Sequence, residues 1–298
     1  MLFQKIVSLF LAILSFFASL SNKTWDDAYV EGAFPMIGVT EKAEGTVRIC
    51  SFNVRCTDVN GVGVKDRIRL VVQKILEIDP DSFGVQEATP EWMDALRKLL
   101  PDYAFTGAER EGDGTGECCA VFYKKERYTL RYSDTKWLSE TPDEPSFGWD
   151  AACKRVYTYA ALKNKYTGEE YVHVNTHFDH VGRQARINAA RQIIDFAQNM
   201  LPGKAVVFTA DMNVTESDPA YSVMMEYFTD ARKTAPDSQF VSATFHGGRS
   251  ELRENSIIDY VLCNDKVEAK TFRVVTTGVD GRFVSDHFPV YADVAVKF

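Results

Sequence analysis

The stretch VRICSFN (47–53) decides the fold, because apolar and polar side chains alternate along it until it ends in an asparagine. Such alternation is typical of a β-strand. Next along the chain, residues 66–78 carry an apolar stripe at helical spacing, formed by Ile68, Val71, Val72, Ile75 and Ile78. A second strand is predicted at SFGVQ (82–86). The chain is therefore expected to open its folded part with a β-α-β unit.

The rest of the chain continues to alternate between strand and helix patterns. A helix is predicted over 90–100, with Thr89 as N-cap and Pro90 in the first position. Further helices are predicted over 182–200 and in a short segment capped by Asp218. Strands are predicted at 119–123, 128–137, 156–163, 171–177, 205–211, 256–263, 270–276 and 290–296. This order predicts mixed sheets covered by helices, in the α+β or α/β class.

Length and composition favour a single large domain. The chain has 298 residues, of which 45% are hydrophobic and 26% charged, as in ordinary globular proteins. No linker-like stretch interrupts the apolar segments after residue 46, and the glycine-rich stretch 112–116 is short enough to be a loop. We therefore expect one domain over 46–298, preceded by an irregular lead-in over 22–45.

Residues 1–21 have the features of a secretory signal peptide. Lys5 is their only charge, residues 6–18 are apolar apart from serines, and Ser19 and Ser21 suit a cleavage site. The alternative is an uncleaved membrane anchor, although the apolar run falls short of the roughly 20 residues that span a bilayer. We predict export, either secreted or periplasmic.

Charge and cysteine usage exclude some function classes. A net charge of −8 disfavours a broad basic surface for gripping duplex DNA. Cys50 and Cys263 lie in apolar strand-like runs, where a buried free thiol is expected, while Cys118 and Cys119 are adjacent. No particular disulfide is therefore predicted. The spacing of Cys and His residues does not resemble a zinc site.

Acidic, amide and histidine side chains occur at the ends of the predicted strands. They belong to the segments SFN (51–53), QE (86–87), NTH (175–177), ADMN (210–213), IDY (258–260) and SDH (285–287). Any one of these polar residues is more often a turn residue or a cap. Their repeated occurrence at strand ends is better explained by one site at the edge of a sheet.

Several of these side chains suit a metal ion. Mg²⁺ takes about six oxygen ligands, including one or two carboxylates, waters and a substrate phosphate. Glu87 and Asp286 are the predicted carboxylate ligands, and Asn53 is expected to supply a neutral oxygen. Mn²⁺ is the expected substitute for Mg²⁺.

The other side chains suit hydrolysis of a phosphate ester. His287, held by Asp259, is the predicted base that deprotonates water. Asp211 is expected to orient that water. His177 and Asn213 are expected to donate to the non-bridging phosphate oxygens, where charge concentrates in the transition state.

These segments resemble, in order, the motifs of the endonuclease/exonuclease/phosphatase superfamily, which includes deoxyribonuclease I, exonuclease III-like nucleases, bacterial sphingomyelinases and inositol polyphosphate 5-phosphatases. The matching stretches are SFNV (51–54), QE (86–87), NTH (175–177), ADMN (210–213), IDYV (258–261) and SDHFPV (285–290). The resemblance covers nearly all of 46–298, and the last two stretches carry most of its weight. One departure is Ala210, where the family usually has a glycine.

The resemblance implies a four-layer sandwich, with two central mixed sheets flanked by helices and the site at one end of the sheets. It implies metal contacts or catalytic roles, matching those argued above, for Asn53, Glu87, His177, Asp211, Asn213, Asp259, Asp286 and His287.

Three further residues are candidates for contact with the substrate. Arg155 lies where some family members place a phosphate-binding arginine, and the alternative is an ordinary surface arginine. His180 is a candidate to line the substrate pocket, with a plain loop residue as the alternative. Trp149 is a candidate to form one wall of the leaving-group site, with anchoring of its own loop as the alternative.

The substrate class is narrowed by exclusion. IDYV (258–261) replaces the tryptophan-cysteine-aspartate-arginine motif usual in inositol phosphatases, and predicted export disfavours an intracellular repair nuclease. We predict an exported, monomeric Mg²⁺-dependent phosphodiesterase, similar to the secreted bacterial branch of the superfamily and without a stable protein partner. Its expected substrate is nucleic acid, a nucleotide, a lipid head group or another small diester. The alternatives are a phosphomonoesterase and a catalytically inert secreted binding protein on the same fold.

Overall fold

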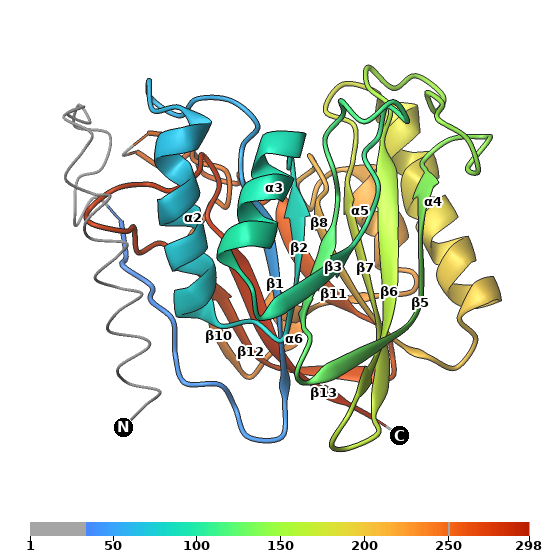
Figure 1. Cartoon of the computed structure of the whole chain (residues 1–298). Helices are drawn as coiled ribbons and strands as arrows, with labels where there is room; N and C mark the ends of the chain where they lie inside the picture. The colour runs from blue at the N-terminus through green and yellow to red at the C-terminus, as the bar shows by residue number, and fades with distance from the viewer. Residues whose placement is uncertain (1–33, 250, 298) are drawn as a thin grey trace.

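The computed structural model describes residues 34–249 and 251–297 (Figure 1). The predicted signal peptide and the first part of the lead-in lie outside these residues. Residues 34–46 contain neither helix nor strand and run directly into the first strand. Within the described ranges, no helix combines the length and the apolar character needed to cross a membrane.

Two mixed β-sheets form the centre of the molecule. In spatial order, the first consists of β10 (Asp237–Gln239), β12 (Val267–Val274), β13 (Val290–Val296), β1 (Val47–Asn53), β2 (Ser82–Gln86), β4 (Val121–Lys124) and β3 (Tyr103–Thr106). The second consists of β5 (Tyr128–Trp137), β6 (Val156–Asn164), β7 (Glu170–His177), β8 (Ala205–Asp211), β11 (Asp259–Cys263) and β9 (Thr229–Asp230).

Helices cover the outer faces of both sheets (Figure 1). The first sheet packs on α2 (Val64–Ile78) and α3 (Pro90–Leu99), and the second on α4 (Arg183–Met200) and α5 (Pro219–Met224). The short α6 (Ala231–Thr234) follows β9. A third apolar core fills the space between the sheets, where Ile49 of β1 and Val207 of β8 are fully buried. The sandwich of two mixed sheets flanked by helices, implied by the family resemblance, is confirmed.

Some predicted strand boundaries were wrong. The strand expected over 256–263 begins only at Asp259, because Ser256 instead exchanges backbone hydrogen bonds with the segment 242–245. The strand expected over 270–276 spans Val267–Val274, where it pairs with β13. The short strand β3 was not predicted, because all four of its residues are only partly buried and give no clear apolar alternation.

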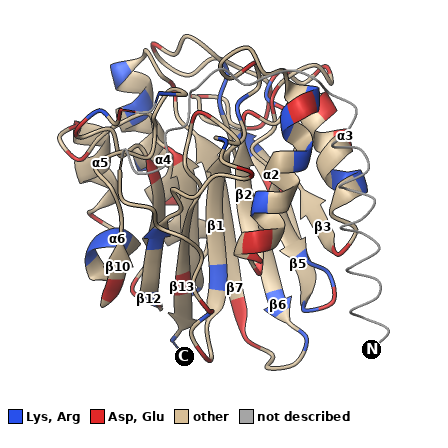
Figure 2. Ribbon diagram, turned by 90° about the vertical axis from the view of Figure 1, so that its left-hand side faces the viewer, with Lys and Arg blue, Asp and Glu red and all other residues tan. Residues whose placement is uncertain are grey.

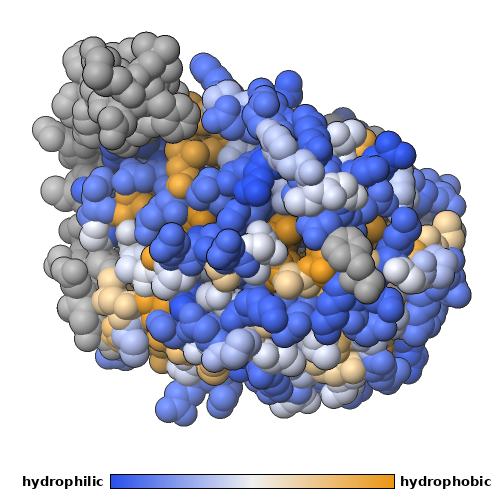
Figure 3. Space-filling view, turned by 90° about the horizontal axis from the view of Figure 1, so that it is seen from below, coloured by the Kyte–Doolittle hydropathy of each residue, from blue (hydrophilic) through white to orange (hydrophobic). Residues whose placement is uncertain are grey.

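Charged residues lie mostly outside the strands, as Figure 2 shows by the largely uncharged strand ribbon. One exception is Arg48 on β1, whose Nε and Nη2 donate to Oδ1 and Oδ2 of Asp293 on β13 at 2.7 and 2.9 Å. The face of the molecule in Figure 3 is mainly hydrophilic, with apolar residues in separate small areas. Such a distribution is normal for the surface of a globular domain.

A buried asparagine joins the two sheets. Asn175 on β7 donates its side-chain amide to the carbonyl oxygens of Val85 and Ala120, in and beside the other sheet, at 2.9 and 3.1 Å. Its own oxygen accepts from Nε2 of Gln86 at 2.7 Å. Gly84 on β2 leaves the space for this approach, since a Cβ at that position would lie 2.1 Å from Oδ1 of Asn175. The contact thereby fixes the end of β2 beside the end of β7.

We expect Gly84→Ala to lower the free energy of unfolding by about 1–3 kcal/mol, because overpacking forces the sheets apart. Asn175→Ala should also cost about 1–3 kcal/mol, because it leaves buried groups without a partner. The double variant should cost less than the sum, since Asn175→Ala removes the two nearest atoms that the new Cβ would meet and leaves only Oγ1 of Thr209, at 2.5 Å, among the three nearest. Urea unfolding curves measure all three, and a fully additive double variant would contradict this account of Gly84.

Candidate active site

The ends of four strands and the start of a fifth bring five of the predicted site residues together. Asn53 ends β1 and Glu87 follows β2, and these two strands are parallel. His177 ends β7 and Asp211 ends β8, which are also parallel, with the two residues in register. Asp259 begins the antiparallel β11 directly opposite Asp211. Sheet topology alone therefore gathers residues that are far apart in sequence.

A cavity of about 390 Å³ opens over these strand ends. Seven of the predicted site residues line it, namely Glu87, Arg155, His177, His180, Asp211, Asn213 and His287. Asn53, Asp259 and Asp286 are buried and contact the lining residues. The structure therefore brings all but one of the predicted residues to the same place, and Trp149 is the exception.

His287 and Asp259 form a buried hydrogen-bonded pair. Nδ1 of His287 donates to Oδ2 of Asp259 at 2.9 Å, and the other ring nitrogen lies 3.7 Å from Oδ2 of Asp211. Burial opposes a charge on the ring, but the carboxylates of Asp259 and Asp211 raise the pKa of His287 to about 10. The imidazole therefore holds a proton at neutral pH and can donate Nε2–H to an anionic oxygen.

Asp211 lies at the centre of the site. Its Oδ1 accepts from the backbone N–H of Asn213 and its Oδ2 from the side-chain amide of Asn53, both at 2.9 Å. Burial and the neighbouring Asp259 raise the pKa of Asp211 to about 7. A carboxyl group whose pKa lies near the working pH is well suited to accept a proton from water.

Asn213 holds His177 rather than facing the cavity with free donors. Its Nδ2 donates to the backbone oxygen of Phe178 at 3.0 Å, which fixes the orientation of the amide, and to Nε2 of His177 at 2.8 Å. Both amide hydrogens are thus used, so the predicted donation from Asn213 to phosphate is not supported.

His177 itself presents one free donor. Because its Nε2 accepts from Asn213, its hydrogen is on Nδ1, which is buried and has no partner within the described residues. Burial, together with the charge of Arg155, lowers the pKa of His177 well below its usual value. The ring is therefore neutral, and its Nδ1–H remains available to a ligand oxygen.

Glu87 and Asp286, the predicted metal ligands, share a cationic neighbour. Nη1 of Arg55 lies 3.8 Å from Oε2 of Glu87, and its Nε lies 3.5 Å from Oδ2 of Asp286. Burial alone would raise the pKa of Glu87, but hydrogen bonds from the backbone N–H of Cys56 at 2.9 Å and from the side-chain amide of Asn53 at 3.0 Å help to lower it. Two carboxylates converging on one cation offer the hard oxygen ligands that Mg²⁺ and Mn²⁺ prefer.

Asn53 bridges two carboxylates. Its Nδ2 donates to Oε1 of Glu87 at 3.0 Å and to Oδ2 of Asp211 at 2.9 Å. Its oxygen, predicted as a neutral metal ligand, accepts from the backbone N–H of Arg55 at 2.9 Å. The oxygen retains a second lone pair, but its first partner in this structure is protein backbone.

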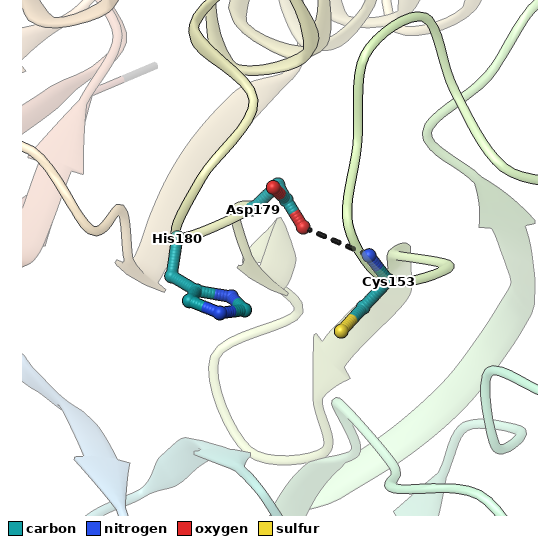
Figure 4. Close-up of side chains that lie close together, drawn as sticks. All are labelled: Cys153, Asp179 and His180. Atoms are coloured by element: carbon teal, nitrogen blue, oxygen red, sulfur yellow. Dashed lines mark hydrogen bonds between the residues drawn. The ribbon is translucent and has the colours of Figure 1, made fainter.

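A second cluster beside the cavity is poorly suited to a metal. Cys153, Asp179 and His180 have potential ligand atoms within 4.8 Å of one another (Figure 4). However, the Asp179 carboxylate already accepts from the backbone N–H groups of Ala152, Cys153, Val181 and Gly182. Arg155 donates to Nδ1 of His180 at 3.2 Å, which places a cation among these groups. Asp179 therefore holds two loops in place.

All six cysteines of the chain, Cys153 among them, are free thiols in the structure, and the sequence predicted no particular disulfide.

The three predicted substrate residues differ in their positions. Arg155 is only 5% exposed, so it is not an ordinary surface arginine. His180 lies exposed at the edge of the cavity. Trp149 does not line the cavity, and the next residue, Asp150, accepts from two backbone N–H groups at the start of α4. This placement corresponds to the alternative in which Trp149 belongs to an anchored loop.

Several cavity residues were not predicted from the sequence. They are Arg55, Cys56, Arg110, Glu117, Cys153, Phe245 and Ile258. Arg55 could have been suspected, because it lies two residues beyond Asn53 at a strand end. Arg110 and Glu117 flank the glycine-rich stretch 112–116, which the sequence identified only as a loop.

Comparisons with known proteins agree with this geometry. The Endonuclease/Exonuclease/phosphatase family matches residues 50–287. The structure of an endonuclease/exonuclease/phosphatase from Bacteroides vulgatus is 34% identical with a TM-score of 0.80, covering 85% of this chain and 99% of that one. The Bacteroides thetaiotaomicron mannosyl-6-phosphatase is 27% identical with a TM-score of 0.77, covering 84% and 99%.

A curated relative matches a shorter part of the chain. Drosophila melanogaster Nocturnin is 23% identical over 186 residues, which are 58% of this chain and 27% of Nocturnin. This chain therefore spans well under half the length of that relative. The family match, in contrast, spans every strand end that contributes to the cavity. The chain belongs to the endonuclease/exonuclease/phosphatase family, whose members are hydrolases of phosphate esters.

Proposed function

We propose that this protein is a Mg²⁺-dependent hydrolase of phosphate esters. The observation that carries the proposal is the convergence of Asp211, Glu87, His177 and the His287–Asp259 pair on one cavity. A structural or inert binding role gives no reason to bury these titratable groups together, since burial of charge is costly without a function or a partner. Export, predicted from residues 1–21, is part of the same proposal.

Glu87 and Asp286 would hold the metal ion, consistent with the general use of divalent metals in this family. Both carboxylates lie close to a single cation, Arg55, at 3.8 and 3.5 Å, so their negative charge is directed at one region. When bound there, Mg²⁺ would neutralise charge on the phosphoryl oxygens. Asn53 would keep Glu87 in position through its hydrogen bond to Oε1.

Asp211 would accept the proton of the attacking water, and protonated His287 would donate to a phosphoryl oxygen. This exchanges the two roles expected from the sequence, where His287 was the base and Asp211 oriented the water. The exchange follows from the pKa values, about 7 for Asp211 and about 10 for His287. Asp259 would orient the imidazolium, and His177 would offer Nδ1–H as a further donor.

We propose phosphomonoesters as the preferred substrates. The similarity to mannosyl-6-phosphatase, at 27% identity over 84% of this chain and 99% of that one, favours this class. A cavity of about 390 Å³ lies near the lower end of the roughly 300–1,000 Å³ usual for small-molecule sites. The phosphodiesterase expected from the sequence is the second candidate. The charges in the cavity favour this second candidate. Arg55, Arg110 and Arg155 each lie beside a carboxylate, so little positive charge remains to bind the doubly negative phosphate of a monoester.

Hydrolysis of p-nitrophenyl phosphate is expected with Mg²⁺ or Mn²⁺ and should be lost in EDTA. His287→Ala should lower kcat/KM by about 10²–10⁴-fold, the usual contribution of a positioned proton donor or acceptor. Asp195→Ala, an exposed change on α4, serves as the control and should be active. The same assay with bis-p-nitrophenyl phosphate decides between monoester and diester. If wild-type protein with Mg²⁺ is no faster than the His287→Ala variant on either ester, the protein is not this enzyme.

The pH dependence tests the proposed proton roles. The value of kcat/KM should rise with pH through about 7, as Asp211 loses its proton, and fall through about 10, as His287 loses its own. Asp259 raises both pKa values, so Asp259→Asn should move both limbs to lower pH. A rising limb that stays in place in the Asp259→Asn variant would argue against Asp211 as the proton acceptor.

A further inference from the structure

One side of the cavity is built from loops rather than strand ends. Its residues are Arg110, Glu117, Cys153, Arg155 and His180, which we call the loop wall. Arg110 and Glu117 come from the connection between β3 and β4, and Cys153 and Arg155 come from the connection between β5 and β6. None of these residues belongs to the motif stretches that supply the proposed chemistry.

The loop wall offers hydrogen-bond donors and acceptors side by side. Nη1 of Arg110 donates to Oε2 of Glu117 at 2.8 Å, and both side chains are 18% exposed. Arg155 donates to Nδ1 of His180, so the hydrogen of a neutral His180 ring is on Nε2. The Nε groups of Arg110 and Arg155 are buried and face the carboxylates of Glu111 and Asp179 at 3.5 Å, so the donors that remain for a ligand are the Nη groups of Arg110 and Nε2–H of His180. The wall therefore combines a carboxylate acceptor with several donors.

A second anionic group is a poor match for this wall. Glu117 already balances the charge of Arg110, and Asp179 lies 3.5 Å from Nε of Arg155. A further phosphate would therefore face the Glu117 carboxylate at close range, and like charges repel.

A nucleobase is also a poor match. Its binding usually relies on stacking against an aromatic ring. Among the residues that line the cavity, the aromatic side chain is Phe245, whose ring centroid lies 4.9 Å from that of His287, on the catalytic side. The loop wall itself provides no such ring apart from the His180 imidazole.

Hydroxyl groups match the wall better. Each hydroxyl donates one hydrogen bond and accepts others, so neighbouring hydroxyls need acceptors and donors next to each other. The Glu117 carboxylate and the Arg110 guanidinium provide this combination in one hydrogen-bonded unit. A neutral group that carries several hydroxyls satisfies both without adding charge.

The wall is held in place before any ligand binds. The carboxylate of Glu109 closes the glycine-rich loop by accepting from the backbone N–H groups of Glu111, Gly114 and Gly116. The backbone oxygen of Arg110 accepts from the indole of Trp137 at 2.7 Å. Such preorganisation reduces the entropy lost on binding.

We propose that the loop wall binds the hydroxyl groups of a polyol, such as a sugar, that forms the leaving group of the phosphate ester. Glu117 accepts from one hydroxyl and Arg110 donates to a neighbouring one. The inference rests on the proposed function. The attacking water forms the new P–O bond and gives a proton to Asp211, while the bond from phosphorus to the polyol oxygen breaks. The polyol takes up one proton and leaves as a neutral alcohol, so the proton lost by the water balances the one gained by the alcohol.

Binding measured without turnover tests the proposal separately from catalysis. In a His287→Ala background, isothermal titration calorimetry should show tighter binding of a hexose 6-phosphate than of inorganic phosphate. Adding Glu117→Ala should weaken hexose 6-phosphate binding by about 10- to 100-fold, the value of one hydrogen bond to a charged group, whereas phosphate binding should not weaken.

Glu111→Ala is the matched control. Glu111 lies in the same loop and contacts Arg110 at 3.5 Å and Lys154 at 3.2 Å, but it does not line the cavity. Glu111→Ala removes one negative charge, as Glu117→Ala does, and should leave the affinities for hexose 6-phosphate and for phosphate unchanged. Circular dichroism checks the fold of each variant. The proposal is overturned if hexose 6-phosphate binds no tighter than phosphate, or if Glu117→Ala weakens both ligands equally. Tight binding of hexose 6-phosphate without hydrolysis by the wild type would overturn the proposed function alone.

Discussion

The contact between Asn175 and the backbone of the first sheet sets the spacing on which the site depends. Side chains two residues apart on a strand point to the same face, so Asn175 and His177 both face the first sheet. His173, two residues earlier, continues this row and bonds to Ser82 at 2.8 Å. These bonds tie β7 to β2 and to Ala120 beside it, and the row ends at the cavity. The distance between Glu87 at the end of β2 and His177 at the end of β7 is therefore a property of the sheet interface, not of a flexible loop.

This rigidity matters because the site is locally unfavourable. Arg55, Glu87 and Asn213 have φ angles of 59°, 59° and 51°, a region that costs residues other than glycine of order 1–3 kcal/mol. Asp259 is buried close enough to Asp211 to raise the pKa of the Asp211 carboxyl, and His287 lies beside both as the compensating cation. Without the surrounding structure, the strained residues and the buried carboxylates would move toward solvent. The apolar cores on either side of each sheet and the hydrogen-bonded row between the sheets outweigh this tendency, so the titratable groups keep their shifted pKa values.

The sequence predicted the features that depend on periodicity and on chain order. The apolar alternation of β1 and the buried run of β8 identified both strands correctly, and the residues at their ends, Asn53 and Asp211, were found because strand ends meet at a sheet edge. The sequence could not reveal that Asn213 uses both amide hydrogens on neighbouring groups, since this depends on distances of 2.8 and 3.0 Å across the fold. For the same reason, the sequence could not show that the pKa of His287 lies above that of Asp211. Arg110 and Glu117 were missed because loops carry no period, so nothing in the sequence indicates the direction in which their side chains point.

The proposed catalytic groups lie mainly at strand ends, whereas the proposed leaving-group contacts lie in loops. This difference determines which part of the site a substitution can alter. The proposed proton transfers and metal ligation involve groups at strand ends, together with Asp286 and His287 just before β13, and His287 is held by Asp259 at the start of β11. A shift of one strand would therefore alter several distances together. The loop wall is fixed separately, by Glu109 within its own loop and by Asp179, whose carboxylate binds the backbone of Cys153. A substitution at Glu117 or Arg110 therefore alters the surface offered to the leaving group while the hydrogen bond between His287 and Asp259 stays as it is. Because the two parts are fixed by different contacts, the identity of the leaving group can vary within one fold without rebuilding the chemistry that cleaves it.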